Sequence, residues 1–149
     1  MNAVLILEDD RWSRSVLNAI LERSYRVTLT DSSEDAIRIC LNEPPDLLVA
    51  DNLLRSATSG VQTVCRVHEL WPKLPFLIVS GTPPEGWHDD DFQCFGRLVM
   101  SARLGYLDKP FTAAELTAKV SDLMNADWNP KGIQLLYERA AMHRPLGRS

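Results

Sequence analysis

Five polar side chains of the sequence each stand at or just beyond the end of a short apolar run: Glu8, Asp9, Asp51, Ser80 and Lys109. Three carboxylates brought to one place repel one another and raise each other's pKa values unless a cation lies between them. Oxygen-rich acidic sites suit a hard divalent ion, and Mg²⁺ with one or two carboxylates and a phosphate is the usual arrangement. A carboxylate can also attack a phosphoryl group, so Asp51 is the best candidate nucleophile.

The other side chains offer what such a transfer needs. The ammonium of Lys109 would reach one phosphoryl oxygen, the hydroxyl of Ser80 would donate to another, and the metal would neutralise developing charge. Each has a simpler explanation when taken alone: a surface lysine, a turn serine, and Asp9 and Asp10 as caps of the first helix. Helix capping does not explain Asp51, which ends an otherwise apolar run. The whole set therefore favours a functional site.

Short apolar runs that alternate with amphipathic segments predict the elements that position these residues. The runs predict strands at 4–7, 25–29, 46–50, 74–79 and 104–107. The segments predict helices at 11–23, from Ser32 or Ser33, after Gly60, at about 90–103, and from a capping box at Thr112 to about 125. Five strand–helix units in series predict an α/β fold with a parallel sheet covered on both faces. Ligands bind at the carboxyl ends of such strands, so the five polar side chains should share one edge.

Composition narrows the class of protein further. With 149 residues, 45% hydrophobic residues and a net charge of −4, the chain suits one globular domain. Residues 131–149 carry a net charge of +3, which leaves the other 130 residues at −7 and argues against direct binding to nucleic acid. Three cysteines without a close pair fit neither a disulfide framework nor a zinc site. No apolar run approaches a membrane span and no basic start marks a signal peptide, so we expect a cytoplasmic protein without a membrane partner.

Four motifs at the strand ends resemble the receiver domain of two-component response regulators. They are LILEDD at 5–10, LLVAD at 47–51, LIVSG at 77–81 and YLDKPF at 106–111. The resemblance covers about residues 2–126. It implies a flavodoxin-like (βα)5 fold, doubly wound, whose five-stranded parallel sheet has the order 2-1-3-4-5. It also implies a cis peptide bond between Lys109 and Pro110.

The same resemblance implies a role for each candidate residue. Asp51 matches the phosphoacceptor, which receives its phosphoryl group from a histidine kinase or a histidine phosphotransfer protein. Glu8 and Asp9 match the acidic pair that binds Mg²⁺, with Asp9 the more direct ligand and Glu8 acting largely through water. The backbone carbonyl of Leu53 would complete the metal site, and Lys109 matches the family's lysine.

Two further positions match the switch that reports phosphorylation. Ser80 matches the hydroxyl residue that moves toward the phosphoryl group, and Tyr106 stands where the family keeps its aromatic switch residue. Phosphorylation adds about 1.5–2 negative charges and new acceptor oxygens at Asp51. The resemblance implies that the protein-interaction surface of the fourth helix, fifth strand and fifth helix then changes. An ordinary core-edge position is the simpler explanation for Tyr106.

The chain departs from the family pattern in two loops. The loop after Asp51 lacks the usual proline at Arg55 and is one residue longer before Gly60. The segment between Ser80 and Lys109 is also longer than usual, with the extra residues expected within 82–91. The acidic run there suits a solvated first helical turn; the alternative is a partner-specific protrusion centred on Trp87.

The residues after 126 form the third departure. We expect a receiver domain at 1–126 and a C-terminal extension at 127–149 with a short amphipathic helix and no separate output domain. Asn129 and Pro130 are typical of a helix start, with Pro130 at the first helical position. An apolar stripe recurs at helical spacing: Ile133, Leu136, Tyr137, Ala140 and Ala141. A lone short helix is marginal in water, so the stripe must pack on its own receiver domain, a partner or a second copy of the chain.

These features favour a phosphoacceptor that signals by protein contact to an unknown target, rather than a turnover enzyme. The alternative is a pseudo-receiver scaffold that binds partners independently of phosphorylation. All the acids, the acceptor and the lysine are present, which weighs against that alternative. A dehalogenase-type hydrolase would need a second acid where Leu53 stands, and a flavin site would not place three acids in its first loop.

Overall fold

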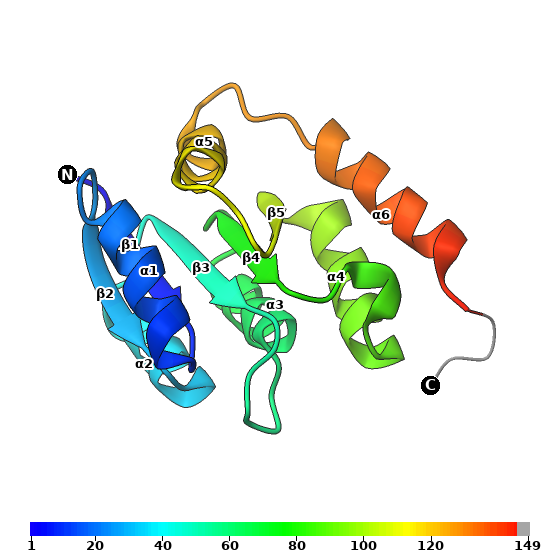
Figure 1. Ribbon diagram of the computed structural model, residues 1–149, viewed down its shortest axis with the longest axis horizontal. Coiled ribbons are helices and arrows are strands. Elements are labelled where there is room, and N and C mark those ends of the chain that lie inside the picture. The colour runs from blue at the N-terminus through cyan, green and yellow to red at the C-terminus, as the bar shows by residue number, and fades with distance from the viewer. Residues whose placement is uncertain (146–149) are drawn as a thin grey trace.

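The computed structural model describes residues 1–145 as five strands and six α-helices with one 3-10 turn (Figure 1). The strands are β1 (Ala3–Leu7), β2 (Arg26–Thr30), β3 (Leu47–Asp51), β4 (Phe76–Ser80) and β5 (Leu104–Asp108). The helices are α1 (Arg11–Leu21), α2 (Ser33–Asn42), α3 (Gly60–Leu70), η1 (Pro84–Gly86), α4 (Asp89–Ser101), α5 (Ala113–Met124) and α6 (Lys131–His143). Among the described residues, no helix is both long and apolar enough to cross a membrane.

All neighbouring strands are parallel, and the sheet order is β2-β1-β3-β4-β5. This confirms the predicted flavodoxin-like fold and its strand order. The register aligns the strand ends, since Asp51 pairs with Val79 and Ser80 pairs with Asp108. The carboxyl ends of β1, β3, β4 and β5 therefore meet at one edge of the sheet. Lys109 and Pro110 are joined by the expected cis peptide bond.

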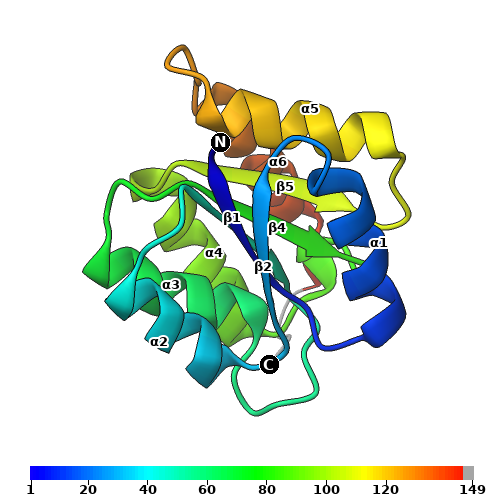
Figure 2. The same cartoon turned by 90° about the vertical axis from the view of Figure 1, so that its left-hand side faces the viewer.

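Helices cover both faces of the sheet, as Figure 2 shows. One hydrophobic cluster joins α1 and α5 to one face, and a second joins α2, α3 and α4 to the other. The three central strands β1, β3 and β4 are buried along almost their whole length, because both of their faces carry apolar side chains. β2 lies at the edge and stays more exposed, as its alternating sequence predicts.

Local signals explain where the elements begin. Ser32, not Ser33, caps α2 by accepting from the amide of Asp35. The predicted capping box of Thr112 and Glu115 is present at the start of α5. β4 begins at Phe76, two residues later than predicted, because Pro75 has no N–H to donate to the sheet. β1 ends at Leu7 as predicted, and the other four strands end one residue later than predicted, at Thr30, Asp51, Ser80 and Asp108.

The long segment between β4 and α4 folds inward rather than protruding. Trp87 is only 4% exposed, and its ring packs against Phe95 and Tyr106. The alternative of a protrusion centred on Trp87 is therefore wrong: the apolar area of the indole is removed from water within the chain itself. The acidic turn is only partly solvated, because Asp91 is buried and accepts hydrogen bonds from Ser59 and Gln62.

The helix of the C-terminal extension packs on its own chain, where α6 lies beside α4 and over β5 (Figure 1). Ile133 and Ala140 are buried and Leu136 and Tyr137 are partly buried against the same cluster, whereas Ala141 is exposed and does not belong to the packed stripe. The helix begins at Lys131, one residue later than predicted. Pro130 is its N-cap, and the Asn129 carboxamide accepts from the Lys131 amide at 2.9 Å.

Candidate functional site

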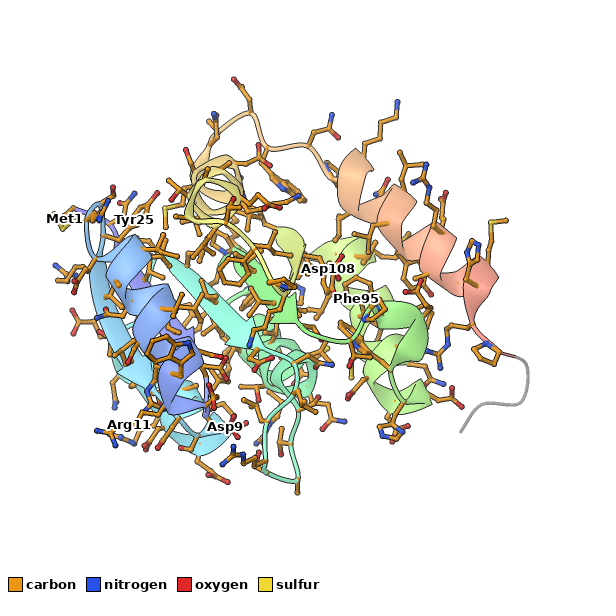
Figure 3. All side chains as sticks on the ribbon, viewed as in Figure 1. Met1, Asp9, Arg11, Tyr25, Phe95 and Asp108 are labelled. Carbon is orange, nitrogen blue, oxygen red and sulfur yellow. The ribbon has the colours of Figure 1, made fainter. Side chains whose placement is uncertain are left out.

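Three carboxylates meet at the carboxyl edge of the sheet. Glu8 follows β1, Asp51 ends β3, and Asp9 leads into α1, where Figure 3 labels it. Glu8, Asp9 and Asp51 each offer an oxygen within 4.8 Å of the others. Glu8 is fully buried and Asp51 is 5% exposed, whereas Asp9 is half-buried. Asp10 turns away from this group and caps α1 by accepting from the Ser13 amide, so helix capping accounts for only one acid of the run.

Lys109 supplies an ammonium that contacts two of the three acids. Its Nζ donates to Glu8 Oε1 at 2.7 Å and to Asp51 Oδ2 at 3.1 Å. Burial by itself lowers the pKa of Lys109, but its hydrogen bonds and charge interactions with Glu8 and Asp51 outweigh burial and raise that pKa. We call the group formed by Glu8, Asp9, Asp51 and Lys109 the acidic edge. It holds three carboxyl groups against one ammonium.

The electrostatics of the acidic edge suit a divalent cation. Burial, followed by the interactions with Asp51, raises the pKa of Glu8 to about 7 against the lowering effect of Lys109. Near neutral pH, Glu8 is therefore partly protonated, and this proton reduces the excess negative charge of the acidic edge. Carboxylate oxygens at this spacing are ligands that Mg²⁺ accepts, so Glu8, Asp9 and Asp51 fit the ion. The amide of Leu53 donates to Asp51 Oδ1 at 3.1 Å. The role of the Leu53 carbonyl as a metal ligand stays a prediction.

Hydrogen bonds fix the loop after β3 to Asp9 and to the start of α3. The Arg55 amide donates to Asp9 Oδ2 at 2.6 Å, so the longer loop folds back toward α1. Asn52 accepts from the amide of Val61 through its side chain and from the amide of Gly60 through its carbonyl. A Cβ at Gly60 would lie 1.9 Å from the carbonyl oxygen of Asp51. Only glycine allows the backbone at position 60 to lie this close to Asp51. The sequence shows a glycine after a polar loop, but it does not show which atom that glycine approaches.

The hydroxyl of Ser80 points into the loop after β4. Ser80 is 1% exposed; its Oγ donates to the Thr82 carbonyl at 2.8 Å and accepts from the Thr82 amide at 3.1 Å. The backbone amide of Lys109 donates to the Ser80 carbonyl at 2.8 Å, which ties the ends of β4 and β5 together. The structure thus places Ser80 at the same edge as the acids, with its hydroxyl engaged by Thr82.

Tyr106 faces inward beside this loop. It is 5% exposed, and its hydroxyl donates to Asp108 Oδ1 at 2.8 Å and approaches the Thr82 carbonyl at 3.4 Å. Burial, followed by the hydrogen bond to Asp108, raises its pKa. The same Thr82 carbonyl accepts from Trp87 Nε1 at 2.8 Å. The role of Thr82 could not be predicted from the sequence, because Thr82 contributes a backbone atom that no residue type reveals.

Apolar side chains surround the entrance to the acidic edge. Trp12 is 77% exposed and Leu53 is 74% exposed. A cavity of about 350 Å³ lies beside Lys109 and is lined by Trp12, Val16 and Phe111, among others. Large exposed apolar groups next to a polar site are typical of a surface that a protein partner covers.

Comparisons with known proteins agree with this geometry. The family model described as response regulator receiver domain matches residues 4–121. The chain is 32% identical over 124 residues to the sensor histidine kinase TmoS of Ectopseudomonas mendocina, a match that covers 82% of this chain and 12% of that protein. It is 26% identical over 125 residues to the alkaline phosphatase synthesis transcriptional regulatory protein PhoP of Bacillus subtilis, over 81% of this chain and 48% of that protein. The chain therefore spans less than half the length of these two relatives.

A solved structure shows the same architecture. The signal receiver domain of a modulated diguanylate cyclase from Desulfovibrio desulfuricans G20 superposes with a TM-score of 0.70 at 27% identity. The superposition covers 91% of this chain and 98% of that domain. The similarity thus extends over nearly the whole of a receiver domain.

Proposed function

The chain belongs to the family of response regulator receiver domains, and on that premise we propose that Asp51 accepts a phosphoryl group. The donor is a histidine kinase or a histidine phosphotransfer protein, and Mg²⁺ is the cofactor. The observation that supports this most is the acidic edge itself, where oxygens of three carboxyl groups lie within 4.8 Å of one another and the Lys109 ammonium contacts two of them. A purely structural cluster would gain nothing from gathering more acids than its single ammonium can neutralise.

The transfer follows from the positions of the side chains. A carboxylate oxygen of Asp51 attacks the phosphorus, the phosphorus–nitrogen bond of the donor's phosphohistidine breaks, and its imidazole leaves with the bonding electrons. When bound, Mg²⁺ held by Glu8, Asp9 and Asp51 would screen the charge on the phosphoryl oxygens. Lys109 would move from the Asp51 carboxylate to one phosphoryl oxygen. Ser80 would turn its hydroxyl from the Thr82 carbonyl to another.

The surroundings of the site support a protein donor and a protein target. The exposed rings and aliphatic groups of Trp12 and Leu53 offer contact area to a donor whose histidine must reach a buried carboxylate. The net charge of −4 disfavours direct binding to nucleic acid. We therefore propose a cytoplasmic signalling module, not a turnover enzyme, that consists of a receiver at 1–126 and an extension at 127–149. Its downstream target is a protein that recognises the switched surface.

Incubation with acetyl phosphate and Mg²⁺ tests the proposal, with intact-protein mass spectrometry as the measurement. The expected result is the addition of one phosphoryl group to the wild-type protein and none to Asp51→Asn. Asp122→Asn is the matched control, since Asp122 is an exposed acid on α5, and it should be phosphorylated like the wild type. The absence of any mass increase, or an equal increase in Asp51→Asn, would contradict the proposal and favour a pseudo-receiver scaffold.

A further inference from the structure

Helix α6 covers a surface made by α4, β5 and η1, which we call the α6-docking surface. Its main contributors are Pro84, Phe92, Phe95, Gly96 and Tyr106. The ring of Tyr137 on α6 stacks on Phe92 with centroids 5.1 Å apart and planes 17° apart. Tyr137 also lies 6.0 Å from the ring of Phe95, which Figure 3 labels on α4. A Cβ at Gly96 would lie 2.9 Å from the Tyr137 hydroxyl, so the close approach of the two helices depends on that glycine.

Arg144 fastens the end of α6 to the segment that follows β4. Its Nη1 donates to the carbonyls of Trp87 at 2.9 Å and Pro84 at 3.3 Å, and its Nη2 pairs with Asp89 Oδ1 at 2.5 Å. The guanidinium also lies 4.3 Å from the centroid of the Phe92 ring. With a side chain only 11% exposed, Arg144 has exchanged water for these contacts. A single side chain therefore latches α6 to the segment 84–89.

The same segment is connected to Ser80 at its other end. The Thr82 carbonyl accepts from two donors, Ser80 Oγ and Trp87 Nε1, and lies 3.4 Å from the Tyr106 hydroxyl, which gives its single hydrogen to Asp108. A serine hydroxyl has only one hydrogen, so Ser80 cannot donate both to Thr82 and to a phosphoryl oxygen. If Ser80 turns toward Asp51, the Thr82 carbonyl loses one donor and the Thr82 amide loses its acceptor. Trp87 donates to the same Thr82 carbonyl through its ring nitrogen, and its own carbonyl accepts from Arg144. A change at Thr82 therefore reaches Arg144 through Trp87.

The contact between α6 and the rest of the chain is incomplete. A cavity of about 350 Å³ remains between α6 and the β5–η1 region, with Tyr106, Leu136 and Arg139 in its lining. Leu136 and Tyr137 stay partly exposed although they belong to the packed stripe. Interfaces with voids forgo dispersion contacts and separate at lower cost than a close-packed core. Separating α6 from this surface should therefore cost less free energy than opening the core of the sheet.

We propose that α6 is an intramolecular ligand of the α6-docking surface, and that phosphorylation of Asp51 releases it. This inference rests on the proposed phosphoacceptor function and adds a regulated element to it. Before phosphorylation, the Thr82 hydrogen bonds hold Trp87 and the Trp87 and Pro84 carbonyls hold Arg144. After phosphorylation, Ser80 leaves Thr82, the segment 82–89 loosens, and Arg144 loses its acceptors. The surface beneath α6 then becomes available to a protein target.

Hydrogen–deuterium exchange on the full chain tests the inference, with acetyl phosphate and Mg²⁺ as the probe. Intact mass on the same sample measures the phosphorylated fraction. Amides of residues 131–143 should exchange about tenfold faster in the phosphorylated protein, within the 5–150-fold span of ordinary allosteric coupling. Phosphorylation with unchanged or slower exchange in α6 would overturn the inference and leave the proposed function intact. A failure to phosphorylate would overturn both.

Two substitutions locate the coupling. Arg144→Gln should speed exchange in α6 without phosphorylation, whereas Glu138→Gln, at an exposed glutamate on the same helix, should leave it unchanged. Trp87→Phe keeps a ring but deletes the donor to Thr82. It should reduce the response of α6 while the phosphoryl mass increase remains complete. Unchanged slow exchange in Arg144→Gln would show that Arg144 does not hold α6 in place. A full response of α6 in Trp87→Phe would show that the coupling does not pass through Trp87. Circular dichroism confirms that each variant is folded.

Discussion

The acidic edge and the α6-docking surface lie on neighbouring strand ends but are built in opposite ways. The acidic edge holds three carboxyl groups against one ammonium, so its charge is not neutralised by the chain alone. At the α6-docking surface, Arg144 finds two carbonyls, a carboxylate and an aromatic ring. The acidic edge needs a further positive charge to be neutral, whereas the charged group of the α6-docking surface, Arg144, already has its partners within the chain. If phosphorylation at the acidic edge removes any of these acceptors, the hold on Arg144 weakens.

The largest expected effect comes from the backbone that shapes the acidic edge. Gly60→Ala places a Cβ against the Asp51 carbonyl, so β3 or the start of α3 must shift. We expect a loss of about 3 kcal/mol in the free energy of unfolding, measured by urea denaturation. Gly132→Ala on α6 is the matched control, because a Cβ there meets nothing within 4 Å, and helix propensity should make it neutral or stabilising. Equal stability of the two variants would contradict the close approach at Gly60.

The uncompensated charge predicts that removing an acid stabilises the metal-free protein. The folded pKa of Glu8 is about 7, above its ordinary value of 4.5, so the folded state binds more protons than the unfolded state between these values. Stability from this group is present below about pH 4.5 and is lost as the pH rises through 7.

Glu8→Gln removes this pH dependence. Its stability relative to the wild type should increase by about 3 kcal/mol from pH 4.5 to pH 8 in a chelator. Denaturation curves at several pH values measure the difference. Glu34→Gln, an exposed acid on α2, serves as the control and should show no such trend. A parallel pH dependence of wild type and Glu8→Gln would exclude Glu8 as the source.

Removing a contact at the α6-docking surface should lower the free energy of unfolding. Tyr137→Ala deletes the ring that stacks on Phe92 and should cost about 1–2 kcal/mol, since the side chain is only partly buried. Leu135→Ala on the same helix, at a residue that is 50% exposed, should cost much less. Thermal unfolding measures both variants. If Leu135→Ala proves as costly as Tyr137→Ala, α6 does not pack through the stripe described above.

The smallest effect is the response to Mg²⁺, which should separate the two regions. A ligand that binds only the folded state at ten times its Kd adds about 1.4 kcal/mol of stability. We expect this gain for the wild type and for Tyr137→Ala, and a much smaller gain for Asp51→Asn. Thermal melts with Mg²⁺ and with chelator make the comparison. A gain in Asp51→Asn equal to that of the wild type would place the ion elsewhere.

Much of the acidic edge could be predicted because it depends on strand ends. Glu8, Asp51 and Lys109 meet since parallel strands in register bring their carboxyl ends to one edge, and apolar runs mark those ends. Trp87 could not be placed in this way. It stands in a polar, proline-rich segment, and its burial depends on rings from α4 and β5 that are distant in the sequence.

The extension illustrates the same limit. The stripe of α6 predicted a helix that must be covered, but periodicity does not identify the covering surface. The contact with Phe92 and the latch by Arg144 arise only when α4 and η1 are in place. The Thr82 carbonyl, which links the two regions, belongs to the backbone and leaves no trace in the residue types.

The most direct test of the account is the location of the phosphoryl group. Borohydride reduces an aspartyl phosphate to homoserine, which peptide mass spectrometry identifies by position. After treatment with acetyl phosphate and Mg²⁺, we predict homoserine at position 51 and at no other aspartate. Homoserine at Asp9 or Asp108 instead, or none in a sample with Mg²⁺ present, would contradict the assignment of the acidic edge as the phosphoacceptor site.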